Sequence, residues 1–126
     1  MNKKTIVIID DEENFCKLVK KNIENTGEYV VFTATSGKEG IALVKQVKPD
    51  LVLLDVVMPE MDGTDVAAQI REDESIQNIP IVFLTAIASE DEAQAESQAS
   101  ITRGYTVLSK TATVKELLSC IKETIR

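Results

Sequence analysis

Histidine and tryptophan are missing from the chain, and only 4% of its 126 residues are aromatic. Without histidine the protein cannot build a serine-type catalytic triad, most kinds of zinc site or a phosphohistidine of its own. A histidine that takes part in its chemistry must therefore belong to a partner. The two cysteines, Cys16 and Cys120, match no metal-ligand spacing, so we expect small buried or half-buried thiols and not a disulfide or redox pair.

Long apolar runs and an excess of positive charge are also missing. No run approaches the roughly 20 apolar residues that a membrane-spanning helix needs. The formal net charge is -7, which disfavours binding to nucleic acid or to an acidic membrane surface. Residues 1–4 lead straight into a β-branched run without a signal-peptide cleavage site. These absences predict a cytoplasmic protein in which this domain contacts neither nucleic acid nor membrane.

What the chain does contain is a regular alternation of strand and helix patterns. Its length and its 44% hydrophobic residues suit one globular domain over residues 1–126. Near-continuous apolar runs predict strands buried on both faces, as in a parallel sheet covered by helices on both sides. We expect five strands and five helices. The predicted strands cover residues 6–9, 29–34, 51–54, 81–84 and 106–109.

Helix starts and faces follow from capping signals and apolar spacing. Ser36 with Glu39 and Thr113 with Glu116 form capping boxes, which predict two helix starts. Residues 89–100 contain no large apolar side chain, so we expect a short or loosely docked helix there. The apolar residues at helical spacing, which we expect to face the core, are Phe15, Leu18, Val19, Ile23, Ile41, Val44, Val47, Val66, Ala67, Ile70, Val114, Leu117, Leu118, Ile121 and Ile125.

Charged and hydroxyl side chains follow four of the predicted strands. Asp10 and Asp11 follow the first strand, and Asp55 follows the third. Thr85 follows the fourth strand, and Lys110 follows the fifth. The carboxyl ends of parallel strands lie along one edge of the sheet, where ligands bind in open α/β folds. We therefore expect these five side chains to meet.

The chemistry of this set indicates a metal ion and a phosphoryl group. Clustered carboxylates repel one another unless a cation neutralises them, and oxygen-only ligands suit Mg²⁺. Asp55 can attack phosphorus and form an acyl phosphate. Thr85 can donate a hydrogen bond to a phosphoryl oxygen, and Lys110 can pair with Asp55 and then with the phosphate. Each residue type is common at a strand end for other reasons, so the prediction depends on the combination.

A longer motif reads Asp55-Val56-Val57-Met58-Pro59-Glu60-Met61-Asp62-Gly63. With this motif the chain resembles the bacterial response-regulator receiver domain, the CheY-like family, and further support comes from Asp10-Asp11-Glu12, Thr85-Ala86 and Lys110. The resemblance covers essentially the whole chain. It implies a flavodoxin-like (βα)5 fold, a doubly wound five-stranded parallel sheet with strand order 2-1-3-4-5.

The resemblance also implies how the acidic residues work. Asp55 would accept a phosphoryl group from a phosphohistidine on a sensor histidine kinase. Mg²⁺ would be bound directly by Asp11 and Asp55 and by the main-chain carbonyl of Val57. Asp10 would act on the ion largely through water.

The resemblance implies phosphate contacts and a switch, and only the switch departs from the family pattern. Thr85 and Lys110 would contact the phosphate, and movement of Thr85 would switch a protein-interaction surface made of the fourth helix, the fifth strand and the last helix. A downstream effector protein or an output domain would read that surface. The family tends to have proline where this chain has Thr111, and Val107 occupies the place of its switch aromatic. Whether Tyr105, on the same strand face, replaces that aromatic is left open.

Three other functions are open on the sequence alone. A phosphatase of the haloacid-dehalogenase type also uses a strand-end aspartate, but it needs a second aspartate where this chain has Val57. A flavodoxin-like flavin binder needs a Ser/Thr/Gly-rich phosphate loop, whereas residues 10–13 are acidic. A receiver-like module that is never phosphorylated would not need the complete set of residues. We expect no turnover enzyme, and slow autodephosphorylation because Val57 and Ile87 are apolar and cannot position water.

The sequence leaves open whether the domain acts alone, as part of a longer protein or as a dimer. No output region follows residue 126, so we expect either a stand-alone regulator or the N-terminal part of a longer one. A homodimer through the last helix is also left open.

Overall fold

The structure, a computed structural model, describes residues 3–86 and 105–125. Five strands form a single parallel sheet with the order β2-β1-β3-β4-β5. This order confirms the predicted doubly wound α/β architecture. The strands are β1 (Lys4–Ile9), β2 (Tyr29–Ala34), β3 (Leu51–Asp55), β4 (Ile81–Thr85) and β5 (Thr106–Ser109).

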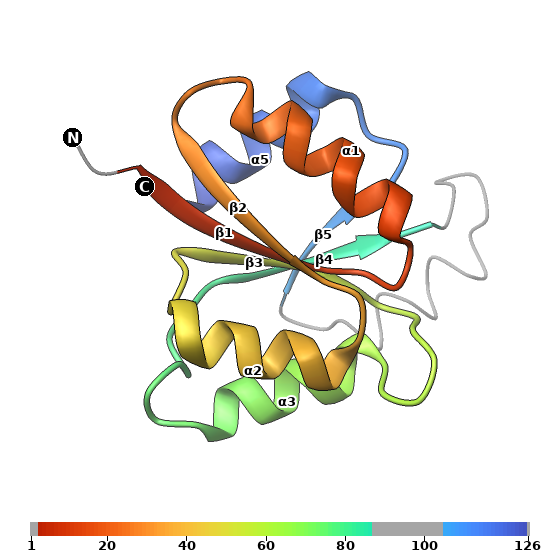
Figure 1. The fold of residues 1–126 in the computed structure, drawn as a ribbon, viewed down its shortest axis with the longest axis vertical. Helices are drawn as coiled ribbons and strands as arrows, with labels where there is room; N and C mark the ends of the chain where they lie inside the picture. The colour runs from red at the N-terminus through yellow and green to blue at the C-terminus, as the bar shows by residue number, and fades with distance from the viewer. Residues whose placement is uncertain (1–2, 87–104, 126) are drawn as a thin grey trace.

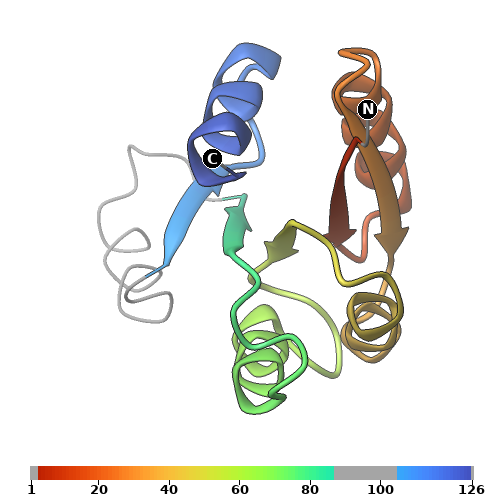
Figure 2. The same ribbon diagram turned by 90° about the vertical axis from the view of Figure 1, so that its left-hand side faces the viewer.

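Helices cover both faces of this sheet, as Figures 1 and 2 show. Helices α1 and α5 lie on one face, and α2 and α3 lie on the other. Helix cover on both faces explains why the central strands are apolar along their whole length. The helix predicted for residues 89–100 lies outside the described residues. The described helices are α1 (Glu13–Glu24), α2 (Gly37–Val47), α3 (Gly63–Glu72) and α5 (Val114–Ile125).

The core is divided in two by the sheet, because successive strand side chains point to opposite faces. In β1, Val7 and Ile9 pack with residues of α2 and α3, whereas Ile6 and Ile8 pack with residues of α1 and α5. All four are fully buried. Burial of one such side chain stabilises the fold by about 1.5–3 kcal/mol. The central strands therefore form a rigid base for the residues that follow them.

Both predicted helix starts are capped, and the reciprocal pair of hydrogen bonds that defines a capping box is recorded at Thr113 and Glu116. The Ser36 hydroxyl accepts a hydrogen bond from the Glu39 amide at 3.1 Å, at the start of α2. Before α5, the Glu116 amide donates to Thr113 Oγ1 at 3.1 Å, and the Thr113 amide donates to Glu116 Oε1 at 3.1 Å. A cap of this kind typically contributes about 1 kcal/mol. Asp62 caps α3 by accepting from the Asp65 amide at 3.1 Å.

Two residues predicted to face the core do not do so. Leu18 of α1 is 59% exposed and Val114 of α5 is 43% exposed. Helix α1 instead packs on the sheet through Cys16, Val19 and Ile23. Leu18 lies to one side of this buried stripe and therefore faces solvent. Both misplaced residues line a cleft of about 80 Å³ between α1 and the β5–α5 region.

The two cysteines are free thiols, as predicted. Cys16 is buried, and its thiol donates to the main-chain carbonyl of Asp10 over 3.3 Å. Burial, reinforced by the charge of Asp10, raises the pKa of Cys16 to about 11. Cys120 is half-buried, and burial raises its pKa as well. Both thiols stay protonated near neutral pH and have a packing role.

Candidate functional site

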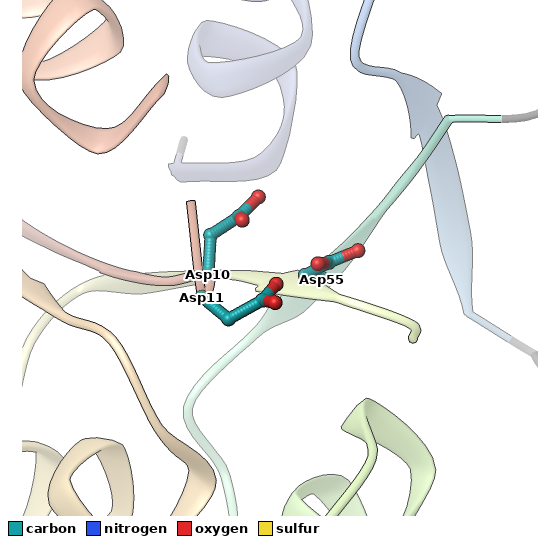
Figure 3. Close-up of side chains that lie close together, drawn as sticks. All are labelled: Asp10, Asp11 and Asp55. Atoms are coloured by element: carbon teal, nitrogen blue, oxygen red, sulfur yellow. The ribbon is translucent and has the colours of Figure 1, made fainter. Parts of the chain in front are cut away.

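Three carboxylates meet at the carboxyl edge of the sheet. Asp10 directly follows β1 and Asp55 ends β3, and these strands are neighbours with Ile9 paired to Leu54. One carboxylate oxygen from each of Asp10, Asp11 and Asp55 lies within 4.8 Å of the other two. Figure 3 shows the three side chains grouped where the two strands end. The predicted convergence of the aspartates is therefore present in the fold.

The three aspartates differ in burial. Asp10 is fully buried and Asp55 is 6% exposed, whereas Asp11 is exposed to solvent. Oδ1 of Asp10 accepts a hydrogen bond from the Glu12 amide at 2.9 Å. Oδ2 of Asp10, also buried, accepts no aligned hydrogen bond from the described residues. The site thus combines a fully buried carboxylate at Asp10 with an open side at Asp11.

Lys110 brings the only positive charge that the structure records at this cluster among the described residues. Its Nζ lies 2.7 Å from Asp10 Oδ2, 2.5 Å from Glu12 Oε1 and 3.8 Å from Asp55 Oδ2. The predicted pairing of Lys110 with Asp55 is present, but it is the longest of the three. The pairing with Glu12 was not predicted, since no local pattern connects residues 98 positions apart.

Thr85 lies beside Lys110 at the end of β4. It is half-buried, and it pairs with Ser109 in the ladder between β4 and β5. The Lys110 amide donates to the Thr85 carbonyl over 2.7 Å. This bond extends the pairing of the two strands by one residue and holds Lys110 at the edge where Asp55 also ends. All five residues that the sequence singled out therefore lie at the carboxyl edge of the sheet.

Burial and mutual charge set the protonation of the site. Burial raises the pKa of Asp55 to about 7, and the charge of Asp10 adds to this while Lys110 opposes it. Burial by itself would lower the pKa of Lys110. The carboxylates of Asp10 and Glu12, and then the charge of Asp55, outweigh that effect and leave the pKa of Lys110 raised. The site holds more negative charge than one ammonium can neutralise.

This donor set fits a hard divalent cation. Its ligand atoms are all carboxylate oxygens, which Mg²⁺ and Ca²⁺ prefer over nitrogen or sulfur ligands. One ammonium, that of Lys110, faces the carboxylates of Asp10, Glu12 and Asp55, and the pKa of Asp55 is raised, so added positive charge would stabilise the cluster. The residues present are therefore compatible with the magnesium ion expected from the sequence.

The loop after Asp55 folds back tightly against its own strand. The Gly63 amide donates to the Val56 carbonyl at 2.8 Å. A Cβ atom at position 63 would overlap the main-chain carbonyl oxygen of Asp55, so only glycine fits there. Glu60 adopts a left-handed backbone conformation with φ 66°. Val57, in the loop after Asp55, is 70% exposed, so its side chain does not pack over the aspartates.

Tyr105, the residue left open as a substitute for the switch aromatic, is half-buried just before β5. Its ring meets Phe83 edge to face, with centroids 5.0 Å apart. The guanidinium carbon of Arg71 lies 5.5 Å from the centroid of the same ring. Val107, at the family's usual position, is 40% exposed. The tyrosine is thus held between a core phenylalanine and an arginine of α3, and its role in switching stays a prediction.

None of the helices in the described residues is both long and apolar enough to cross a membrane.

Comparison with known proteins gives relatives that share both sequence and fold. PhoP, the alkaline phosphatase synthesis transcriptional regulatory protein of Bacillus subtilis, is 43% identical over 86 residues, which are 68% of this chain and 34% of that protein. RpaA, a DNA-binding dual master transcriptional regulator of Synechocystis, is 36% identical over 121 residues, 96% of this chain and 48% of that protein. The chain therefore spans less than half the length of these two regulators.

Solved structures agree with the sequence relatives. Chemotaxis protein CheY4 of Vibrio cholerae superposes with a TM-score of 0.80 at 25% identity, covering 98% of this chain and 99% of that one. The family model of the response regulator receiver domain matches residues 6–122. The fold, the strand order and this match lead to one conclusion. The chain belongs to the response regulator receiver domain family.

Proposed function

We propose that this domain is a phosphoacceptor in two-component signalling, and that Asp55 takes the phosphoryl group. The observation that carries the proposal is the meeting of Asp10, Asp11 and Asp55, with ligand oxygens within 4.8 Å of one another, beside the Lys110 ammonium. The donor is a phosphohistidine on a sensor histidine kinase, which fits a chain that has no histidine of its own.

Asp55 acts as the nucleophile. One of its carboxylate oxygens forms a bond to phosphorus while the bond between phosphorus and the donor histidine nitrogen breaks, and the electron pair of that bond stays on the nitrogen. The attacking carboxyl must be ionised. Burial opposes ionisation by raising the pKa of Asp55 to about 7, and Lys110 favours it from 3.8 Å. Thr85 and Lys110 then contact the oxygens of the bound phosphoryl group.

The carboxylates of Asp11 and Asp55 and the main-chain carbonyl of Val57 would bind Mg²⁺ directly, and Asp10 would act on the ion largely through water. When bound, Mg²⁺ supplies positive charge that neutralises the carboxylates and stabilises charge on the transferring group. Exposure of Asp11 leaves one side of the cluster open for the ion and for the phosphodonor. The Asp10 carboxylate is held by the Glu12 amide and the Lys110 ammonium.

The domain stores a phosphoryl group and is not a turnover enzyme. A phosphatase of the haloacid-dehalogenase type needs a second aspartate as general acid two residues after the nucleophile. Val57 stands at that position, and its apolar side chain can neither donate a proton nor orient an attacking water. Dephosphorylation of the isolated domain is therefore slow.

Phosphorylation changes a protein-interaction surface that includes β5 and α5. Lys110 follows β5 directly, so movement of its ammonium toward a phosphate at Asp55 is transmitted to that strand. The readers are a downstream effector protein or an output domain. Two relatives are named as transcriptional regulators, so control of transcription by an output domain is one such use. The domain works in the cytoplasm and contacts neither nucleic acid nor membrane itself.

Labelling with a small phosphodonor tests this function directly. Wild-type protein is incubated with acetyl phosphate and Mg²⁺, and its intact mass is measured. We expect a gain of one phosphoryl group in the wild type and in Asp65→Asn, whose substituted residue is exposed on α3. Asp55→Asn should gain none. Equal labelling of Asp55→Asn and wild type, or no labelling of either, would contradict the proposal.

A further inference from the structure

Glu12 holds the Lys110 ammonium more closely than the proposed phosphoacceptor does. Its Oε1 lies 2.5 Å from Lys110 Nζ, against 3.8 Å for Asp55 Oδ2. Hydrogen bonds between such groups span about 2.7–3.2 Å, so the ammonium is beyond hydrogen-bonding distance of Asp55. Glu12 is neither a metal ligand nor a phosphate contact in the function proposed above. Its carboxylate nevertheless binds the Lys110 ammonium, which must contact the phosphate.

The contact of the Glu12 carboxylate with Lys110 is not a consequence of helix capping. Glu12 is the N-cap residue of α1, with an extended backbone (φ -88°, ψ 98°). Residues at this position typically turn a side-chain oxygen to the first free amides of the helix. The Glu12 side chain makes no such bond. Its carboxylate turns toward Lys110, which comes from the far end of the chain.

Other contacts keep the ammonium on the same side of the site. Asp10 Oδ2 lies 2.7 Å from Nζ, and the ring of Phe15 on α1 lies 4.5 Å from it. The Lys110 side chain is only 8% exposed. Asp10, Glu12 and Phe15 all belong to the β1–α1 segment. The closest contacts of the Lys110 ammonium are therefore with this segment and not with Asp55 of β3.

We infer that Glu12 is a positioning residue that parks Lys110 and competes with a phosphoryl group on Asp55 for the ammonium. The inference rests on the phosphoacceptor function proposed above. Before phosphorylation, the parked ammonium leaves Asp55 open to the donor. After phosphorylation, the anionic phosphoryl group must draw Lys110 from Glu12, and part of the binding energy of the phosphate is consumed in that step. Glu12 thereby weakens the phosphorylated state relative to the free one.

The experiment compares Glu12→Gln with Glu13→Gln as a matched control. Glu13 is the next residue, it is similarly exposed, and it pairs with Lys17 at 3.3 Å without contacting Lys110. Both variants therefore remove one negative charge near the site, but only the first releases Lys110. Affinity for fluoroberyllate, an aspartyl-phosphate mimic, is measured at saturating Mg²⁺. The side-chain ammonium signal of Lys110 is recorded by NMR in free and bound protein.

We expect Glu12→Gln to bind fluoroberyllate about two- to fivefold more tightly than wild type, in the range of one partly exposed ion pair. Glu13→Gln should stay close to wild type. The Lys110 signals of wild type and Glu12→Gln should differ in the free proteins and coincide in the bound ones, because the ammonium has then left Glu12. A purely structural role for Glu12 would not produce that coincidence.

Two results would overturn the inference alone. One is fluoroberyllate binding that Glu12→Gln and Glu13→Gln change equally or leave unchanged. The other is a Lys110 signal that still differs between wild type and Glu12→Gln after binding. A different result, in which no protein binds fluoroberyllate with Mg²⁺ while the free Lys110 signals differ as expected, would overturn the phosphoacceptor function and the competition with it.

Discussion

The two halves of the site are built in different ways. The carboxylate half, from β1 and β3, sits on strands whose last four residues are all buried. The lysine half, from β4 and β5, ends on a four-residue edge strand with no buried residue. Its Lys110 is held by contacts with the β1–α1 segment. The carboxylates therefore have a rigid base, whereas the position of the ammonium depends on a few polar contacts.

This difference separates chemistry from response. A phosphoacceptor needs its nucleophile and metal ligands in one place before the donor arrives, and preorganised groups act without reorganisation. A switch needs a part that has two arrangements with different affinity for the phosphate. In this domain the carboxylate half suits the first requirement and the lysine half suits the second.

Lys110→Met should produce the largest effect, because it breaks the link between the halves. It leaves the buried carboxylates of Asp10 and Asp55 without their cation, so we expect the free energy of unfolding at pH 8 to fall by about 3–5 kcal/mol. Mg²⁺ should stabilise the variant more than the wild type, since the ion replaces the missing charge. Denaturant unfolding with and without Mg²⁺ measures both effects.

The control is Lys45→Met, which breaks a more exposed pair with Asp73 at 3.5 Å. It should cost at most about 1 kcal/mol and show no special response to Mg²⁺. Equal losses in the two lysine variants would contradict the view that Lys110 neutralises a buried cluster.

Asp55→Asn should stabilise the metal-free protein. The folded-state pKa of Asp55 is about 7 and its ordinary value is 3.8, so the folded state binds the extra proton between these values. Stability of the wild type therefore falls as pH rises through that window, and the cost of the ionised carboxylate is complete above it. We expect Asp55→Asn to be more stable than wild type by about 2–4 kcal/mol at pH 8.

The advantage of Asp55→Asn should shrink as pH falls toward 4, because Asp55 is then protonated in the folded state and begins to be protonated in the unfolded chain. Thermal or denaturant unfolding of both proteins is compared between pH 4 and about 8, the range in which the shifted pKa of Asp55 affects stability. A difference that does not change with pH would show that burial and Asp10 do not destabilise the carboxylate.

Gly63→Ala tests the loop that supports the carboxylate half. A methyl group at this position overlaps the Asp55 carbonyl oxygen, so the loop must shift, at a cost of about 1–3 kcal/mol. Affinity for Mg²⁺ should fall as well, because Asp55 and Val57 move. Gly27→Ala is the control: its φ of 78° also disfavours alanine, at about 1 kcal/mol, but nothing lies within 4 Å of the added methyl group.

The informative result is the difference in Mg²⁺ affinity between the two glycine variants, measured by calorimetry. Equal affinities would mean that the loop does not position the metal ligands.

Tyr105→Leu should have the smallest effect, and it tests the lysine half. The change removes the edge-to-face contact with Phe83 and the contact with Arg71, so we expect a loss of about 1 kcal/mol. Tyr105→Phe keeps the ring and should stay within about 0.5 kcal/mol of wild type. Urea midpoints report both values. If Tyr105→Phe lost as much unfolding free energy as Tyr105→Leu, the hydroxyl and not the ring would hold this residue.

The fold and the carboxylate half could be predicted from local sequence. Apolar runs at β1, β3 and β4 are long enough to indicate strands buried on both faces, and the capping boxes before α2 and α5 are complete within four residues. Because parallel strands end on one edge, Asp10, Asp11 and Asp55 had to meet once the strand order was known.

The rest depends on contacts that no local pattern records. Helical spacing brings Leu18 and Val114 close to the core stripe, but the packing of α1 and α5 decides which side chains are covered, and these two are not. The pair between Glu12 and Lys110 joins residues 98 positions apart. Its only sequence signal is a third acidic residue after Asp10 and Asp11, which an exposed helix start also explains.

The decisive measurement is a crystal structure of the domain with Mg²⁺ and fluoroberyllate. We expect fluoroberyllate on the Asp55 carboxylate, the ion at the cluster of three aspartates, and the Lys110 ammonium moved from Glu12 to the bound anion. Fluoroberyllate or Mg²⁺ bound at another group of side chains, with Asp55 unmodified, would contradict this expectation.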